Sequence, residues 1–292
     1  MNNLERAAEV PWGEPRSAIV KPRDPVVVPA GSVPLSPYYQ DERVTIYNAD
    51  WRELKDYLGQ NPVDAIITDP PYGLEEFAKG RNHGRSRLGR ANFVDDGWDK
   101  EVETSEAVYA MLCAAPSMLK KGGNLFSFAA LERLGDVISH APKPLYYKTS
   151  GVWHKKNPIP INMKIRFVGS LESWVHWVNG QRTGTFNAKG KSVHNFIETG
   201  LTPKSEKEHG KHSTQKPLSV MNWATSLLTN PGDLILDPFM GSGSTIIAAK
   251  LSGRKSIGIE IDEKYCEIAA KRAESLNVSN HLKAILNGDT NE

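Results

Sequence analysis

Short apolar segments alternate with helical ones from Arg43 onwards, and this alternation constrains the fold more than any other feature of the chain. The segment at 63–68 is almost wholly apolar, as are strands that are buried on both faces of a sheet. Similar segments lie at 44–47, 124–128, 147–154, 174–178, 234–236 and 256–259, and helical patterns lie at 51–58, 104–119, 217–228, 245–251 and 263–276. The alternation predicts an α/β fold with a doubly wound, mostly parallel sheet between layers of helices.

Four acidic residues lie at or just after the ends of predicted strands: Asp50, Asp69, Asp237 and Glu260. A single acid there means little, because Asp is common in the turn after a strand. In an open parallel sheet, however, ligands bind beyond the carboxyl ends of the strands, where the strand order reverses. We therefore expect these four residues to line one polar crevice.

The segment at 237–245 predicts a strand, a glycine-containing turn and a helix, whose first N–H groups point at a ligand. Gly241 and Gly243 let the backbone turn tightly and approach a bound molecule. The segment lacks the Lys-Ser/Thr of a phosphate-binding loop. Glu260 follows at about the spacing at which an acid binds ribose hydroxyls, so a nucleoside-bearing ligand is expected. A helix cap followed by a tight turn is the simpler alternative.

Asp69-Pro70-Pro71-Tyr72 directly follows the predicted strand at 63–68. The prolines keep the Pro70 carbonyl from bonding within a helix or a strand ladder, and Asp69 places a carboxylate beside it. Two acceptors next to the flat ring of Tyr72 suit an exocyclic amine on an aromatic base. An ordinary proline-rich turn is the alternative, although its position after a buried strand favours a site.

These motifs resemble those of DNA methyltransferases that modify exocyclic amino groups with S-adenosylmethionine. The catalytic motif precedes the cofactor motif, which is similar to the permuted, beta-type order of that family. Matching segments also lie at 48–50, 96–99, 153–158, 212–217 and 257–260, although Ala49 stands where the family has glycine. The resemblance covers about residues 43–275 and leaves 179–211 unmatched.

The resemblance implies a fold of the S-adenosylmethionine-dependent methyltransferase type with an inserted recognition region. It divides the chain into a proline-rich N-terminal arm (1–42), a catalytic half (43–178), a target-recognition segment (179–211) and the cofactor-binding half of the same domain (212–292). We expect the arm to be extended or partly disordered, because its prolines break helices and remove ladder donors.

The implied reaction moves a methyl group to the N6 amine of a flipped-out adenine in duplex DNA. Asp69 and the Pro70 carbonyl accept the two amine hydrogens, and Tyr72 stacks on the base. In the family, Asp at this position is typical of adenine enzymes and Ser of cytosine enzymes. DNA cytosine-N4 methylation is therefore the nearest alternative. RNA or a protein amide as acceptor, and a catalytically silent nucleic-acid-binding module, are more distant ones.

The resemblance also assigns cofactor contacts to residues of both halves. Asp237 and the turn would line the methionine side, Glu260 would bind the ribose, and Asp50 the adenine amine. Phe239 would form an apolar wall, and Lys216 would hold the cofactor carboxylate. The full predicted set is Asp50, Lys216, Asp237, Phe239, Gly241, Ser242, Gly243 and Glu260, and no metal is expected.

Basic residues cluster where DNA contact is expected, although a solvated surface is the simpler explanation of any one cluster. Glycines and asparagines among them allow loops to order on a phosphate backbone. The predicted DNA contacts are Arg81, Arg85, Arg87 and Arg90 after Tyr72, Lys155 and Asn157, and Arg182, Lys189 and Lys191 in the recognition segment.

Composition excludes several other classes of protein. The formal net charge of +2 is nearly balanced, and the two cysteines form neither a disulfide framework nor a Cys-x-x-Cys pair. No apolar run has the length of a membrane span or a secretory signal, so a cytoplasmic location is expected. Duplex DNA is the expected partner, and a second copy of the chain and a cognate restriction endonuclease are further candidates.

Overall fold

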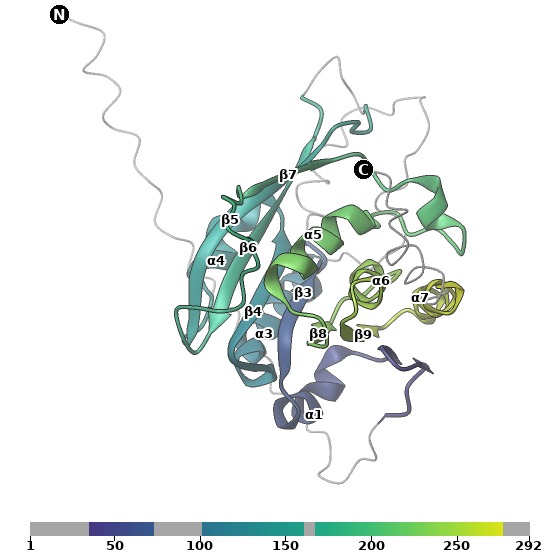
Figure 1. The fold of residues 1–292 in the computed structure, drawn as a ribbon, viewed down its shortest axis with the longest axis horizontal. Helices are drawn as coiled ribbons and strands as arrows, with labels where there is room; N and C mark the ends of the chain where they lie inside the picture. The colour runs from purple at the N-terminus through teal and green to yellow at the C-terminus, as the bar shows by residue number, and fades with distance from the viewer. Residues whose placement is uncertain (1–34, 73–100, 161–166, 277–292) are drawn as a thin grey trace, which may run out of the picture. The chain divides into compact units, whose positions relative to one another are not determined.

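The computed structural model describes residues 35–72, 101–160 and 167–276, with only the backbone for 101–107 (Figure 1). Three predicted features lie outside the described residues: the arm up to residue 34, the segment at 96–99, and the arginines at 81, 85, 87 and 90.

The described residues form one nine-stranded sheet in the order β1-β2-β9-β8-β3-β4-β6-β5-β7. Strands β2, β9, β8, β3 and β4 are parallel, whereas β6 runs antiparallel to both β4 and β5, and β1 antiparallel to β2. The strands are β1 (Tyr39–Gln40), β2 (Val44–Asn48), β3 (Val63–Thr68), β4 (Leu119–Ala129), β5 (Leu145–Lys155), β6 (Leu171–Asn179), β7 (Phe196–Thr199), β8 (Leu234–Asp237) and β9 (Lys255–Glu260).

Helices cover both faces of the sheet because alternate strand residues point to opposite sides. Ile66 packs in a cluster with α1, α3 and α4, whereas Ala65 and Ile67 pack in another with α5 and α6. The helices are η1 (Trp51–Leu54), α1 (Lys55–Gln60), α3 (Glu101–Met118), η2 (Leu131–Arg133), α4 (Leu134–Ser139), η3 (Lys204–Lys207), α5 (Leu218–Leu228), α6 (Ser244–Leu251) and α7 (Glu263–Ser275). The predicted α/β, doubly wound fold is confirmed.

None of the helices within the described ranges is long and apolar enough to cross a membrane.

Two element boundaries differ from the sequence prediction. Residues 39–40, which we assigned to the arm, form edge strand β1, and an ion pair of 2.6 Å between Asp41 and Lys250 fastens the turn after it. Strand β4 begins at Leu119, directly after α3, rather than at 124 as the sequence predicts. Leu119 pairs with Val63 of β3, and after a register shift Asn124 pairs with Ala65, so pairing with β3 sets where the strand begins.

Part of the segment at 179–211 belongs to the sheet, because Asn179 ends β6 and residues 196–199 form β7. Strand β6 ends at Asn179 beside Leu145, the first residue of β5, which is the edge opposite to the carboxyl ends of the parallel strands. Asn187 stays at that edge, where its backbone N–H and side chain bind the carbonyls of Leu227 and Thr229. Strand β7 then returns along β5, and Thr199 pairs with Lys155. Only the second half of the segment therefore reaches the carboxyl edge.

The strand order reverses between β3 and β8 (Figure 1). From β3 the chain continues to β4 on one side, and from β8 to β9 on the other. Because ligands bind at such a switch point, the corner after β3 (Asp69–Tyr72) and the glycine turn after β8 (241–243) belong to one crevice. The hydroxyl of Thr68, the last residue of β3, donates a hydrogen bond of 2.6 Å to Asp237, the last residue of β8.

Candidate active site

Asp237 ties the two halves of the site together. Its side chain is buried and accepts hydrogen bonds from the hydroxyls of Thr68 and Thr245, each 2.6 Å, and from the Phe239 N–H at 3.1 Å. Burial raises the pKa of Asp237 to about 6, although these hydrogen bonds oppose the rise. The residue therefore fixes the geometry of the switch point as well as facing the glycine turn.

The glycine turn depends on backbone conformations that glycine adopts without strain. Gly241 has φ of 52° and Gly243 φ of 85°, and Gly243 is the N-cap of α6. A Cβ at Gly243 would lie 2.9 Å from the Cβ of Ala269 in α7. The turn is also held from outside, because Arg272 donates to the Ser242 carbonyl at 2.5 Å.

Glu260 lies beside this turn at the end of β9. Its carboxylate accepts the N–H groups of Gly241 and Asp262, each at 2.9 Å. Burial raises the pKa of Glu260. A carboxylate has about four lone-pair sites, so two donors leave it able to accept hydroxyl groups as well.

Asp50 follows β2, the strand next to β9, and caps η1. Its carboxylate accepts the backbone N–H and the Nε of Arg52, both at 2.9 Å, and Glu53 completes a capping box. Burial opposes its charge, but the hydrogen bonds from Arg52 lower the pKa of Asp50. Local helix capping thus explains this acid, and its contact with a cofactor adenine stays a prediction.

The corner after β3 carries a chain of alternating charges. The Tyr72 hydroxyl donates to Asp69 Oδ1 at 2.8 Å, and the Lys216 ammonium pairs with Asp69 Oδ2. The same ammonium lies 2.9 Å from Glu172 Oε2, and Lys155 Nζ lies 2.5 Å from Glu172 Oε1. These side chains come from four segments that are far apart in the sequence, so only the fold brings them together.

The charges in this corner are mutually dependent because they are largely removed from water. Burial raises the pKa of Asp69, and Lys216 opposes that rise. Burial also disfavours ionised Glu172, but Lys216 and Lys155 lower the pKa of Glu172 to about 2. The Lys216 ammonium further lies 4.8 Å from the centre of the Phe128 ring, where a cation is attracted by the ring face.

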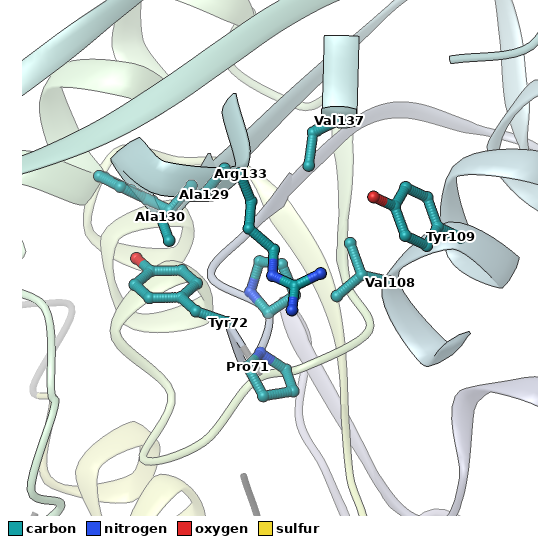
Figure 2. Close-up of a pocket in the computed structure, with 10 residues that line it drawn as sticks. Pro71, Tyr72, Val108, Tyr109, Ala129, Ala130, Arg133 and Val137 are labelled. Carbon is teal, nitrogen blue, oxygen red and sulfur yellow. The ribbon is translucent and has the colours of Figure 1, made fainter. Parts of the chain in front are cut away.

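A pocket opens beside the same corner (Figure 2). Pro70, Pro71 and the Tyr72 ring form one wall of it, and Arg133 and Tyr109 supply polar groups. Flat apolar walls with a few polar groups suit a planar heterocycle.

Residues 63–271 match the family model described as DNA methylase (N6_N4_Mtase). The chain belongs to this family. It is 33% identical over 260 residues to the type II methyltransferase M2.LlaDCHI of Lactococcus lactis subsp. cremoris, with 83% of this chain and 93% of the relative covered. It is 32% identical over 267 residues to the type II methyltransferase M2.DpnII of Streptococcus pneumoniae, with 86% and 97% covered.

Solved structures of other methyltransferases resemble this DNA methylase in fold. The complex of M1.HpyAVI with S-adenosylmethionine is 28% identical and has a TM-score of 0.62, with 80% of this chain and 100% of that chain covered. A PvuII DNA methyltransferase described as cytosine-N4-specific is 18% identical and has a TM-score of 0.63, with 86% and 95% covered. At that identity the second likeness shows the fold alone.

The structure brings most predicted catalytic and cofactor residues of the methylase to one edge, but it gives Lys216 a different setting. We predicted that Lys216 holds the cofactor carboxylate, whereas its ammonium is bound between Asp69 and Glu172. Two buried carboxylates already balance this cation, which argues against a third as its partner. Phe239 is partly buried against the core cluster that includes Ile257 and Ile259.

The predicted DNA contacts that the structure describes fall into two groups. Lys155 is inside the site, bound to Glu172 and 5.4 Å from the Trp153 ring centre, and Asn157 accepts the Leu201 N–H at 2.8 Å. Arg182, Lys189 and Lys191 are exposed on the stretch that runs along the opposite edge of the sheet, so they do not face the crevice. The antiparallel direction of β6, which carries the chain away from the site, is the physical reason.

Glu172 and Thr68 are the functional residues that sequence reasoning missed. The only signal for Glu172 was a carboxylate near the start of an otherwise apolar strand, and Thr68 gave none, since Thr is common in strands. Within the part of the chain that the structure describes, no group of three or more His, Cys, Asp or Glu side chains is arranged to hold a metal ion.

Proposed function

We propose that this DNA methylase transfers a methyl group from S-adenosylmethionine to the N6 amine of an adenine flipped out of duplex DNA. The observation that carries the proposal is the meeting of the Asp69–Tyr72 corner and the 241–243 turn at one switch point. The Thr68–Asp237 hydrogen bond of 2.6 Å joins them directly. A donor site and an acceptor site that share one crevice are what a direct group transfer requires.

The cofactor half offers groups whose chemistry suits S-adenosylmethionine. A Cβ at Gly243 would clash with Ala269 of α7, so glycine lets the turn pack closely against that helix and keep its shape. In the proposed complex Glu260 accepts ribose hydroxyls, Asp237 and the turn line the methionine, Phe239 forms an apolar wall and Asp50 faces the adenine. The bound cofactor supplies an activated methyl group on a sulfonium.

The catalytic corner supplies the electrostatics of the transfer. The lone pair of the target amine is conjugated into the base, which makes the amine a weak nucleophile. Asp69 and the Pro70 carbonyl accept the two amine hydrogens and so favour the pyramidal nitrogen that gains positive charge during attack. Holding the reacting atoms in line can contribute ~7–11 kcal/mol. Asp69, whose pKa burial raises, is the nearest base for the proton that the methylated nitrogen releases.

The pocket beside Tyr72 is the proposed site of the extruded base. The enzyme cannot reach an amine inside a duplex, so the base has to leave the base stack and stack on side chains of the protein instead. The rings of Tyr72 and Phe128 offer that stacking, and Arg133 and Tyr109 offer hydrogen bonds to the base edge. Asp at position 69, where cytosine enzymes of the resembled family tend to have Ser, favours adenine.

DNA is proposed to bind along the carboxyl edge of the sheet. The short helix η3 carries Lys204 and Lys207 there, and the Glu206 carboxylate fixes it by accepting the Leu218 N–H at 2.9 Å. Lysines at such a position bind phosphates and fix the register of the duplex. Recognition of a base sequence by the second half of 179–211, and phosphate contacts by Arg81, Arg85, Arg87 and Arg90, remain part of the proposal.

The test is incubation of the protein with labelled S-adenosylmethionine and a pool of duplex oligonucleotides, followed by digestion to nucleosides. We expect label in N6-methyladenine. Label in N4-methylcytosine would identify the alternative acceptor, since both are exocyclic amines in the same kind of pocket. Absence of transfer to any duplex, together with retained DNA binding, would instead support the silent binding module.

Further partners and the location of the protein are separate predictions. A second copy of the chain and a cognate restriction endonuclease would be detected by light scattering of the purified protein and by co-purification from its own cells. A cytoplasmic location, which gives access to duplex DNA, would be checked by cell fractionation.

A further inference from the structure

We propose that Lys216 and Glu172 are positioning residues for Asp69. Lys216 orients the Asp69 carboxylate and keeps it ionised for the target amine, and Glu172 holds Lys216 in place while limiting its electrostatic effect. The proposal rests on the proposed function, because it concerns the same carboxylate.

The geometry consists of an unbroken series of contacts from Asp69 to Lys155. Lys216 binds Asp69 Oδ2 on one side and Glu172 Oε2, at 2.9 Å, on the other, and Lys155 closes the series at 2.5 Å from Glu172 Oε1. The exposed fraction of the side chain is only 5% for Lys216, 22% for Asp69 and 20% for Glu172. Two anions and two cations leave the corner without net charge.

Lys216 is supplied by the segment that also supports the cofactor turn. The Ser244 hydroxyl donates to the Lys216 carbonyl at 2.8 Å, and the Ser242 hydroxyl donates to the side chain of Gln215 at 3.1 Å. The same two residues that fix the turn thus fix the lysine that touches Asp69. This arrangement places the acceptor carboxylate in register with the methyl donor's site.

The two donors on Asp69 leave it able to accept the amine. The Tyr72 hydroxyl binds Oδ1 and the Lys216 ammonium binds Oδ2, and a carboxylate has about four lone-pair sites. A protonated Asp69 would instead present an O–H group and could not favour positive charge on the amine. Burial pushes Asp69 towards that protonated form, and Lys216 is the cation in contact that opposes it.

The charged and titratable groups that surround Asp69 among the described residues all affect its pKa. Lys216 and Tyr72 touch it, Glu172 lies on the far side of Lys216, and Lys155 lies beyond Glu172. Asp237, buried at the end of β8, is a further anion, and it interacts electrostatically with Asp69. Removing the lysine charge should therefore raise the pKa of Asp69, and removing the Glu172 charge should lower it. Opposite shifts distinguish this role from mere support of the fold.

The experiment measures single-turnover methyl transfer against pH at saturating S-adenosylmethionine in wild type, Lys216→Met and Glu172→Gln. The acid limb, which is the fall in rate on the acidic side of the pH profile, should move to higher pH in Lys216→Met. The shift should be about 1–3 pH units if the Lys216–Asp69 ion pair is of ordinary strength. In Glu172→Gln it should move to lower pH. Above the limb, the rate of Lys216→Met should recover towards that of wild type.

Two controls separate the proposal from loss of folding. Lys250→Met removes another buried lysine, which pairs with Asp41 at 2.6 Å away from the corner, and should leave the acid limb unmoved. The double variant Lys216→Met/Glu172→Gln removes one charge of each sign, and should bind S-adenosylmethionine as wild type does with a limb between those of the single variants.

A pH-independent loss of rate in Lys216→Met, or shifts of the same sign in both single variants, would overturn the proposal. So would a limb that Lys250→Met moves as far as Lys216→Met does. Absence of transfer by the wild-type protein would be a failure of the proposed function and not of this inference, and the two failures are therefore distinguishable.

Discussion

The Thr68–Asp237 hydrogen bond leads to the sharpest stability prediction, because it crosses the switch point. Thr68→Val keeps the shape of the fully buried side chain and removes the donor at 2.6 Å from Asp237 Oδ1. A hydrogen bond to a charged group contributes ~1.5–3 kcal/mol, whereas a neutral one contributes ~0.5–1.5 kcal/mol. Above pH 6 Asp237 is ionised, so the variant should lose ~1.5–3 kcal/mol of unfolding free energy there.

The same variant has a pH dependence of defined sign. Because the pKa of folded Asp237 is raised from 3.8 to about 6, ionisation of this buried group destabilises the fold as pH rises through that window. Loss of the Thr68 donor raises that pKa further. The difference between wild type and Thr68→Val should therefore grow from pH 5 to pH 8.

Urea unfolding at several pH values measures these differences. Thr225→Val is the matched control, because Thr225 is also fully buried but its hydroxyl has no hydrogen-bond partner among the described residues. Removing such a hydroxyl should be neutral or stabilising. Equal losses in both variants, or a Thr68→Val loss that shrinks with rising pH, would refute the reasoning.

Two further predictions concern the cofactor turn and the DNA surface. Gly243 and Gly232 both have a positive φ, so alanine at either position costs ~1–2 kcal/mol. Of these two positions, only Gly243 would bring the new Cβ against another atom, the Cβ of Ala269 at 2.9 Å. Calorimetry should show S-adenosylmethionine binding weakened by about tenfold or more in Gly243→Ala and unchanged in Gly232→Ala; equal affinities would contradict the role of the turn. Lys204→Ala should lower the slope of log affinity for duplex DNA against log salt by about 1, and the exposed Lys191→Ala at the opposite edge should not. The reverse order would contradict the assignment of the DNA-binding edge.

The elements that build the switch point could be predicted because their signals are local. The apolar runs of β3, β8 and β9 and the acids that follow them are sufficient to predict a parallel sheet with one crevice. The observed strand order confirms that fold, and β3 and β8 are neighbours within it. Local propensity and topology agree here, as they do in a minimally frustrated fold.

The parts that could not be predicted depend on the direction of one strand and on side-chain packing. Glu172 reaches Lys216 only because β6 runs antiparallel and starts beside Ala129 at the carboxyl edge. The same direction carries Arg182 away from the crevice. Charge groups Arg182 with the DNA contacts, since charge patterns do not encode which edge of a sheet a residue occupies. The resemblance assigns Lys216 to the cofactor, since a sequence motif does not show which carboxylates the ammonium meets in the fold.

The central claim is that Asp69 acts on the amine of the base and not on the methyl donor. Its most direct test is to measure, on Asp69→Ala, both the affinity for S-adenosylmethionine and the single-turnover rate of methyl transfer to a duplex that the wild type modifies. We expect unchanged cofactor affinity and a rate lower by about 10²–10³, as for the loss of one preorganised group. A rate near that of wild type, or a loss explained wholly by weaker cofactor binding, would contradict the account.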